Sequence, residues 1–194
     1  MAAITELVFE VKEMLEQLQV VYWVDSGTLL GQYRMEEVIP WDLDGDVGIF
    51  DDGFEKLRTT ELKISSGYEL NVWNSSIYTR HDRGPDLPAR LIDTTYGFYV
   101  DIFVFSPTLS TNRGESMVGP LPSLAWNSCA GCRVVNPEGE STTKEKLKRF
   151  VVPLNWIVPT QRCSLNDFYV MCPAQPVPYL QELYGEEFLN PIVW

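Results

Sequence analysis

The chain has 194 residues, 45% of them hydrophobic, with six Trp, nine Tyr and nine Phe. This length and this supply of large apolar side chains indicate one globular domain and exclude a disordered tail, a collagen or a coiled coil. Acidic residues outnumber basic residues by 27 to 15, for a net charge of −12, so we expect no nucleic-acid partner, and an anionic substrate would need a metal ion or a local basic pocket.

The first fifty residues are predicted to alternate helices and strands. Apolar residues recur at the spacing of an amphipathic helix over 4–19. The β-branched and aromatic run 20–24 predicts a buried strand that ends at the turn Asp25-Ser26-Gly27. We expect a short helix over 28–34 and, after Pro40, a second strand over 41–50.

The rest of the chain is predicted to extend the same architecture. A helix over 52–62 is followed by strands over 68–73, 76–80, 89–94 and 98–105, and a final helix runs from Pro176 to Gly185. Residues 106–146 are rich in Pro, Gly, Ser and Asn, which predicts a long loop. The sequence therefore predicts a single α+β domain over residues 1–194, in which a mixed sheet is flanked by helices.

No membrane-spanning segment is expected in this chain. No apolar run approaches the roughly 20 residues that span a bilayer, and residues 1–16 are too acidic for a signal peptide. We therefore expect the chain as written to be soluble.

Three carboxylates, Asp42, Asp44 and Asp46, alternate along the predicted strand 41–50. Alternate side chains lie on one face of a strand, about 6.6 Å apart, so these charges repel unless a proton or a cation intervenes. Oxygen ligands without His or Cys favour Mg²⁺ or Mn²⁺, or Ca²⁺. An EF-hand loop is excluded, because its glycine and glutamate positions hold Val47 and Gly53.

Two other interpretations of the carboxylate strand stay open. The three carboxylates are compatible with a solvent-exposed polar face, although strands avoid Asp. They are also compatible with a glycosyltransferase that holds a sugar nucleotide through an Asp-x-Asp pair. The turn Ser26, Gly27 and Thr28 lies between a predicted strand and helix, where backbone N–H groups hold phosphates. By itself this turn is ordinary, but close ahead of the carboxylate strand it favours a phosphate-containing substrate.

Four segments of the chain carry a family resemblance. They are Gly27-Thr28-Leu29-Leu30-Gly31 with Arg34, Ile39-Pro40-Trp41-Asp42-Leu43-Asp44-Gly45-Asp46, Tyr99-Val100-Asp101-Ile102-Phe103, and Tyr179-Leu180 with Leu183-Tyr184-Gly185. Together they resemble the LicD/fukutin family of the nucleotidyltransferase-fold superfamily. The resemblance implies a nucleotidyltransferase-like fold and a metal-dependent transferase. Such an enzyme moves phosphocholine or a phospho-polyol such as ribitol phosphate from a CDP-activated donor (CDP-choline or CDP-ribitol) to a glycan hydroxyl and releases CMP.

The same resemblance implies roles for the carboxylates. Asp44, Asp46 and Asp101 would bind the metal, Mg²⁺ or Mn²⁺, with two ions expected. Asp101 also interrupts the apolar run 98–105, where a buried charge needs a cation. Asp42 completes the catalytic set by binding the metal through water, orienting a ligand or acting as base. Asp101 is a second candidate for accepting the proton of the acceptor hydroxyl.

Several other side chains are candidates for binding the donor. Ser26, Gly27 and Thr28 would receive its phosphates, together with Arg34 and Arg90, whose forked guanidinium groups suit phosphate oxygens.

Each of these basic and aromatic candidates has a structural alternative. Arg34 could instead form a surface salt bridge with a neighbouring glutamate, and Arg90 could pair with Asp93. Trp41 and Trp73 could stack on a base or on a choline-like headgroup, although a core position is more typical of tryptophan.

The four cysteines, Cys129, Cys132, Cys163 and Cys172, are compatible with a structural zinc site, with two disulfides or with free thiols. Asn74-Ser75-Ser76 is a glycosylation sequon. Eukaryotic relatives are usually lumenal Golgi domains behind a membrane anchor, so we expect the Golgi or another secretory lumen if an anchor was removed, and the cytoplasm otherwise. A catalytically inactive relative that binds glycans is the remaining alternative, but it has no reason to keep mutually repelling carboxylates.

Overall fold

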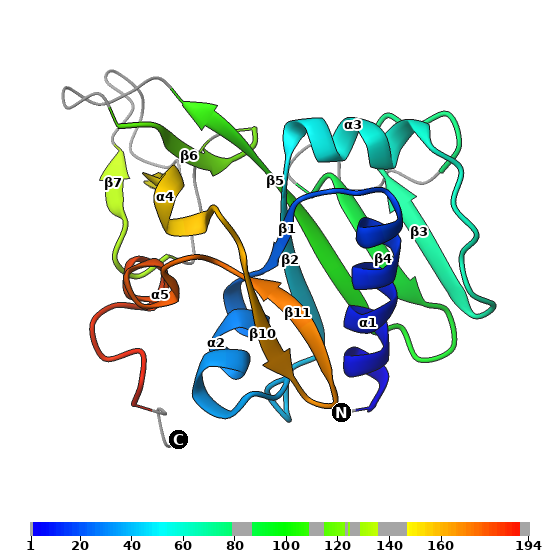
Figure 1. Ribbon diagram of the computed structural model, residues 1–194, viewed down its shortest axis with the longest axis horizontal. Helices are drawn as coiled ribbons and strands as arrows, with labels where there is room; N and C mark the ends of the chain where they lie inside the picture. The colour runs from blue at the N-terminus through cyan, green and yellow to red at the C-terminus, as the bar shows by residue number, and fades with distance from the viewer. Residues whose placement is uncertain are drawn as a thin grey trace, which may run out of the picture.

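The structure, a computed structural model, describes residues 2–78, 87–108, 115–122, 124, 129–135 and 147–190 and has an α+β fold (Figure 1). The described helices are α1 (Ala2–Gln17), α2 (Ser26–Met35), α3 (Asp51–Thr59), α4 (Leu154–Ile157) and α5 (Pro176–Tyr184). The described strands are β1 (Tyr22–Val24), β2 (Asp44–Phe50), β3 (Tyr68–Val72), β4 (Ala89–Asp93), β5 (Tyr99–Thr108), β6 (Met117–Pro120), β7 (Arg133–Val135), β8 (Leu147–Arg149), β9 (Val152–Pro153), β10 (Gln161–Leu165) and β11 (Phe168–Cys172). The predicted fold class, a mixed sheet flanked by helices, is confirmed.

A seven-stranded mixed sheet forms the centre of the molecule. Its main path runs β1-β2-β5-β4-β3, and β6 extends it by pairing with both β5 and β9. The two middle strands, β2 and β5, are parallel, with Asp46 opposite Asp101. Strand β4 is antiparallel to β5, with Arg90 opposite Asp101. The pairing therefore lines up Asp46, Asp101 and Arg90 in one row across three strands.

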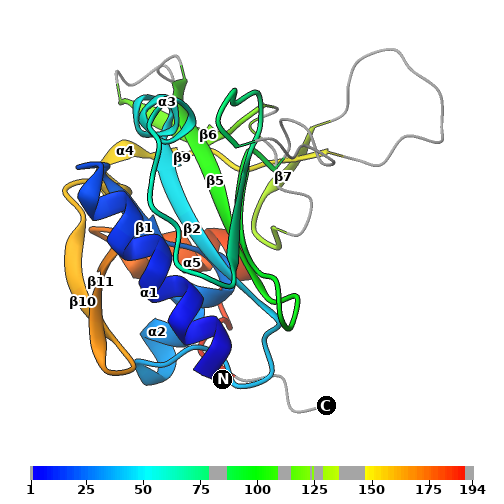
Figure 2. The same ribbon diagram turned by 90° about the vertical axis from the view of Figure 1, so that its right-hand side faces the viewer.

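Helix α1 covers one face of this sheet and contacts β2, β4 and β5. Figure 2 shows α1 and the β10–β11 hairpin along the same side of the sheet. The helix buries Leu7, Val8, Val11 and Leu15 almost completely, as the apolar spacing predicts. Burying side chains of this size stabilises the fold by about 1.5–3 kcal/mol each.

An aromatic cluster fills the space beside β1, β2 and β5. The Trp23 ring packs 5.1 Å from the rings of both Phe50 and Phe105, and Phe150 links Phe105 to Tyr179 through edge contacts. Gly48 makes room for Trp23, because a Cβ at this position would lie 2.3 Å from a ring carbon of the indole. A tryptophan ring cannot yield at that distance, so the packing requires glycine here.

Two expectations about local structure are wrong in part. Residues 76–78 form a bend rather than a strand, while residues 79 and 80 lie outside the described part of the chain. The segment 106–146 contains the end of β5 as well as β6 and β7. These strands have little local signal because their partners are distant in sequence: Met117 pairs with Pro153 and Arg133 with Arg149.

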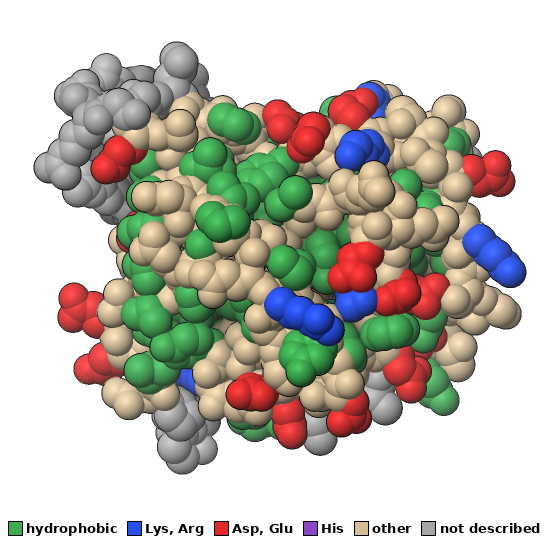
Figure 3. All heavy atoms as spheres, in the orientation of Figure 1, with side chains coloured by type: hydrophobic (Ala, Val, Ile, Leu, Met, Phe, Trp, Pro, Cys, Tyr) green, Lys and Arg blue, Asp and Glu red, His purple; other side chains and the backbone are tan. Residues whose placement is uncertain are grey.

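The surface shows where large apolar side chains stay exposed. In the view of Figure 3, apolar side chains gather over α4 and α5. Trp41 is 76% exposed and Trp73 is 38% exposed, so the expectation that both lie in the core is wrong. None of the described helices is long and apolar enough to cross a membrane.

Candidate active site

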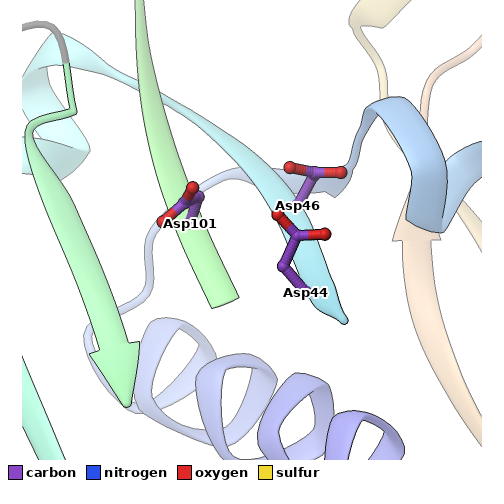
Figure 4. Close-up of side chains that lie close together, drawn as sticks. All are labelled: Asp44, Asp46 and Asp101. Atoms are coloured by element: carbon purple, nitrogen blue, oxygen red, sulfur yellow. The ribbon is translucent and has the colours of Figure 1, made fainter. Parts of the chain in front are cut away.

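Three carboxylates meet at the start of the parallel strand pair. Asp44 and Asp46 come from β2, and Asp101 comes from the neighbouring β5. Figure 4 shows the three side chains close together on these neighbouring strands. One carboxylate oxygen from each residue lies within 4.8 Å of the other two. The predicted grouping of these three side chains follows from the β2–β5 register, which places Asp46 beside Asp101.

The carboxylates line a cavity of about 340 Å³. Its floor is formed by β2 and β5, and its walls by the first residues of α2, the last residues of α5 and one cysteine. The lining residues are Ser26, Gly27, Asp42, Asp44, Asp46, Asp101, Phe103, Cys129, Leu183 and Tyr184. All four predicted catalytic carboxylates therefore reach one cavity, whose volume lies in the range of small-molecule sites.

Burial and mutual repulsion raise the pKa values of two of these carboxylates. Burial, followed by the charges of Asp44, Asp25 and Asp101, raises the pKa of Asp46 well above its usual value. Burial, followed by the charge of Asp44, raises the pKa of Asp42 to about 6. A divalent cation would relieve the same repulsion, and carboxylate oxygens are the ligands that Mg²⁺ and Mn²⁺ prefer. The donor set therefore fits such an ion.

Asp101 already has a cationic partner in Arg90. The Arg90 Nε lies 2.5 Å from Asp101 Oδ1, and Arg90 Nη2 lies 2.8 Å from Asp101 Oδ2. The alternative pair of Arg90 with Asp93 is wrong: Asp93 accepts hydrogen bonds from the backbone N–H groups of Thr95 and Tyr96. The guanidinium of Arg90 is thus engaged by a carboxylate, not displayed toward the cavity as a phosphate ligand.

Two backbone N–H groups at the start of α2 donate hydrogen bonds to aspartates of this region and are therefore not free to bind a phosphate. The N–H of Gly27 donates to Asp46 Oδ2 at 3.1 Å, and the N–H of Asp46 donates to Thr28 Oγ1 at 2.9 Å. Ser26 lines the cavity with a left-handed backbone, at φ 41°. The N–H of Ser26 donates to Asp25. Ser26 and Gly27 therefore lie where the sequence predicts, whereas Thr28 uses its hydroxyl to position Asp46.

Asp25 is an important residue of the site that the sequence analysis missed. It is fully buried, caps α2, and accepts a hydrogen bond from the hydroxyl of Tyr179 at 3.1 Å. Burial raises the pKa of Asp25 to about 7, against the lowering effect of the Ser26 N–H. The available signal was its place before Ser-Gly-Thr as a helix cap. This side chain ties the start of α2 to α5, two of the walls of the cavity.

Arg34 lies away from the carboxylates. Its Nη2 donates to the backbone carbonyls of Phe188 and Asn190, the second at 3.4 Å. Arg34 is not among the described residues that line the cavity, and no salt bridge joins it to a neighbouring glutamate in the described part of the chain. The structure instead uses Arg34 to hold the segment that follows α5.

The four cysteines form two disulfides, Cys129–Cys132 and Cys163–Cys172. Of the three alternatives, two disulfides are therefore confirmed. The zinc site and the free thiols are wrong, because zinc binds thiolates and not disulfide sulfurs. The first disulfide borders the site, since Cys129 lines the cavity. The second joins β10 to β11.

Comparison with known proteins agrees with this arrangement of fold and site. The family model described as LicD/FKTN/FKRP, nucleotidyltransferase domain, matches residues 19–123, the segment that carries the four carboxylates. The chain therefore belongs to the LicD/FKTN/FKRP family.

Individual relatives match shorter segments. Over 78 residues, 39% of this chain, it is 42% identical to the ribitol 5-phosphate transferase FKRP of mouse (Mus musculus) and to that of human (Homo sapiens). It is also 43% identical over 44 residues, 23% of this chain, to an uncharacterised protein of Rickettsia prowazekii (strain Madrid E). The matched segment spans 16% of the length of each of these three relatives.

Proposed function

We propose that this protein is a metal-dependent transferase that moves a phospho-headgroup from a CDP-activated donor to a glycan hydroxyl. The observation that carries the proposal is the cluster of Asp44, Asp46 and Asp101, whose oxygens lie within 4.8 Å of one another in a cavity of about 340 Å³. Membership of the LicD/FKTN/FKRP family supports transferase chemistry at this cluster. Because the chain is similar to the ribitol 5-phosphate transferase FKRP, CDP-ribitol is the first donor to test, and CDP-choline is the second.

The reaction is a displacement at the phosphorus next to the headgroup. The oxygen of the acceptor hydroxyl forms a new bond to this phosphorus, and the bond from the phosphorus to the bridging oxygen breaks. The bonding electrons leave with CMP, and the hydroxyl proton passes to a base. The product carries a phosphodiester between headgroup and glycan.

The chain's own side chains supply positions for this chemistry. Asp44, Asp46 and Asp101 would hold Mg²⁺ or Mn²⁺, which when bound would offset the negative charge of the diphosphate. Asp42 lines the cavity outside this cluster, so it is a candidate to take the proton. Ser26 and Gly27 border the same space and would contact the donor phosphates.

Nucleotide preference tests the proposed donor. We expect titration calorimetry in Mn²⁺ to show tighter binding of CDP than of UDP or GDP. With a glycan acceptor, incubation with CDP-ribitol or CDP-choline is expected to release CMP. A preference for UDP, with UDP as released product, would instead establish a glycosyltransferase with an Asp-x-Asp site. Binding of glycans without any CMP release would establish an inactive relative.

We also propose that the protein works in a secretory compartment, such as the Golgi lumen. Its two disulfides and its exposed sequon residue Asn74 support this location. Expression in a secretory pathway is expected to add an N-glycan at Asn74, visible as a mass that falls after enzymatic deglycosylation. Purification from its native cells with four free thiols would contradict the location.

A further inference from the structure

The ion pair between Arg90 and Asp101 lies mostly buried beside the carboxylate cluster. The two side chains are 11% and 10% exposed, and the guanidinium donates to both oxygens of the carboxylate. The guanidinium carbon also lies 3.6 Å from the centroid of the Tyr99 ring. Stacking and a bidentate hydrogen bond both restrict the arginine to one geometry.

This arginine brings a positive charge to a site that otherwise gathers negative charge. None of the described residues that line the cavity is Lys or Arg, while four of them are aspartates. Asp101 lies opposite both Asp46 and Arg90 in the sheet. Both oxygens of Asp101 therefore accept hydrogen bonds from Arg90. The same carboxylate belongs to the cluster that could bind a metal ion.

We propose that Arg90 balances the charge of Asp101 in the metal-free protein and competes with the metal ion for that carboxylate. The inference rests on the metal site of the proposed function and names a residue that tunes it. Arg90 is a positioning residue, because it acts through Asp101 and touches neither the cavity nor a reacting atom. When a cation binds, Asp101 shares its oxygens between that cation and Arg90.

Two other roles for Arg90 give different measurements. An arginine that binds donor phosphate affects the affinity for CDP but not the stability of the metal-free protein. An arginine that only holds strands β4 and β5 together affects stability equally with and without metal. Competition for Asp101 instead makes the effect of Arg90 depend on the metal, because the ion compensates the carboxylate charge after the arginine is removed.

The test compares Arg90→Gln with a matched control, Arg162→Gln. Arg162 lies 4.0 Å from the centroid of the Tyr169 ring. The two arginines occupy equivalent positions in antiparallel strand pairs. Tyr99 lies opposite Ile92, two residues after Arg90, and Tyr169 lies opposite Ser164, two residues after Arg162. The control thus removes a similarly stacked arginine away from the carboxylate cluster.

Thermal unfolding and Mn²⁺ titration are measured for both variants and the unaltered protein. For Arg90→Gln we expect the Tm to fall by about 10 °C without metal, as for a broken buried ion pair in a chain of this size. In saturating Mn²⁺ we expect less than half of that loss, and at least ~10-fold tighter Mn²⁺ binding, because a competing charge is gone. Arg162→Gln is expected to leave Mn²⁺ affinity unchanged.

The outcomes separate this inference from the proposed function. Absence of any Mn²⁺ binding by the unaltered protein overturns the metal site and the inference together. Equal Tm losses with and without Mn²⁺, or weaker Mn²⁺ binding by Arg90→Gln, overturn the inference alone. If Arg90→Gln does not fold without metal, the double variant Arg90→Gln/Asp101→Asn is used. Recovery of metal-free folding by this variant supports the inference, and its failure to fold overturns it.

Discussion

Asp44 and Asp46 differ from an ordinary acidic strand face because a third carboxylate faces them from β5. Replacing either aspartate with asparagine removes a charged ligand while keeping the size of the side chain. We expect Asp44→Asn and Asp46→Asn to lower turnover by roughly 10³-fold, about 4 kcal/mol of transition-state stabilisation. CMP release and Mn²⁺ titration measure the loss. Full activity of Asp44→Asn with undiminished Mn²⁺ binding contradicts the assignment.

A separate prediction concerns Asp25. This residue is fully buried behind the residues that line the cavity, and burial raises its pKa to about 7. An unfolded chain releases this proton near pH 4. Between about pH 4 and pH 7 the folded protein keeps a proton that the unfolded chain has lost, so the stability due to Asp25 declines as the pH rises. The decline is at most about 1.4 kcal/mol per pH unit.

Asparagine at position 25 tests this pH dependence. Asp25→Asn keeps an oxygen for the Ser26 N–H and cannot ionise, so we expect a flatter dependence of Tm on pH between 4 and 7. The variant should also be at least as stable as the unaltered protein at pH 8. Thermal unfolding across this pH range measures both effects, and an unchanged pH profile would count against the protonated state of Asp25.

At the scale of elements, the Cys129–Cys132 disulfide holds the end of α5 against the cavity. The N–H groups of Ala130 and Gly131 donate to the carbonyls of Leu183 and Glu182, at 2.7 and 3.0 Å. Gly131 is needed for this approach, since a Cβ there would lie 2.5 Å from the Glu182 carbonyl oxygen. The short disulfide loop therefore satisfies carbonyls at the C-terminus of the helix, as a helix cap does.

Serine substitutions at each disulfide measure its effect on stability and on CDP binding separately. Loss of Cys129–Cys132 is expected to cost about 2 kcal/mol of stability, and loss of Cys163–Cys172 about 3 kcal/mol, because the second loop is longer. The first double variant should also weaken CDP binding by about 3- to 10-fold through movement of the cavity wall. Calorimetry measures the affinity, with the second double variant as the control that keeps it. Equal affinity in both variants contradicts a role of the first disulfide in the site.

At the scale of the whole molecule, the acidic site links stability to pH and to metal. Asp25, Asp42 and Asp46 all have raised pKa values. The metal-free protein therefore loses stability as the pH rises from about 4, where these groups ionise in the unfolded chain, toward the folded values of about 6 for Asp42 and about 7 for Asp25. We expect the Tm without metal to fall by about 5 °C or more between pH 5 and pH 8. Mn²⁺ should raise the Tm more at pH 8, where the carboxylates are ionised. Equal Mn²⁺ stabilisation at pH 5 and pH 8 would contradict this linkage.

The sequence by itself determined much of this protein. Local apolar spacing predicted α1, and the alternation of aspartates predicted β2 as a carboxylate-bearing strand, although β2 begins at Asp44 and leaves Asp42 just ahead of it. The charge of Asp101 within an apolar run correctly indicated a buried carboxylate that needs a cation. These features are readable because they depend on neighbours along the chain and on chemistry that few residue types supply.

Tertiary structure decided the partners of these residues. The cation at Asp101 is Arg90, 11 residues away and brought opposite it by the β4–β5 register. The cap residue Asp25 meets Tyr179 across 154 positions of sequence, and the cysteines pair as disulfides. The spacing of residues along the chain indicates which charged and polar side chains need partners. Strand register and the packing of distant elements determine which of these side chains come within hydrogen-bonding distance.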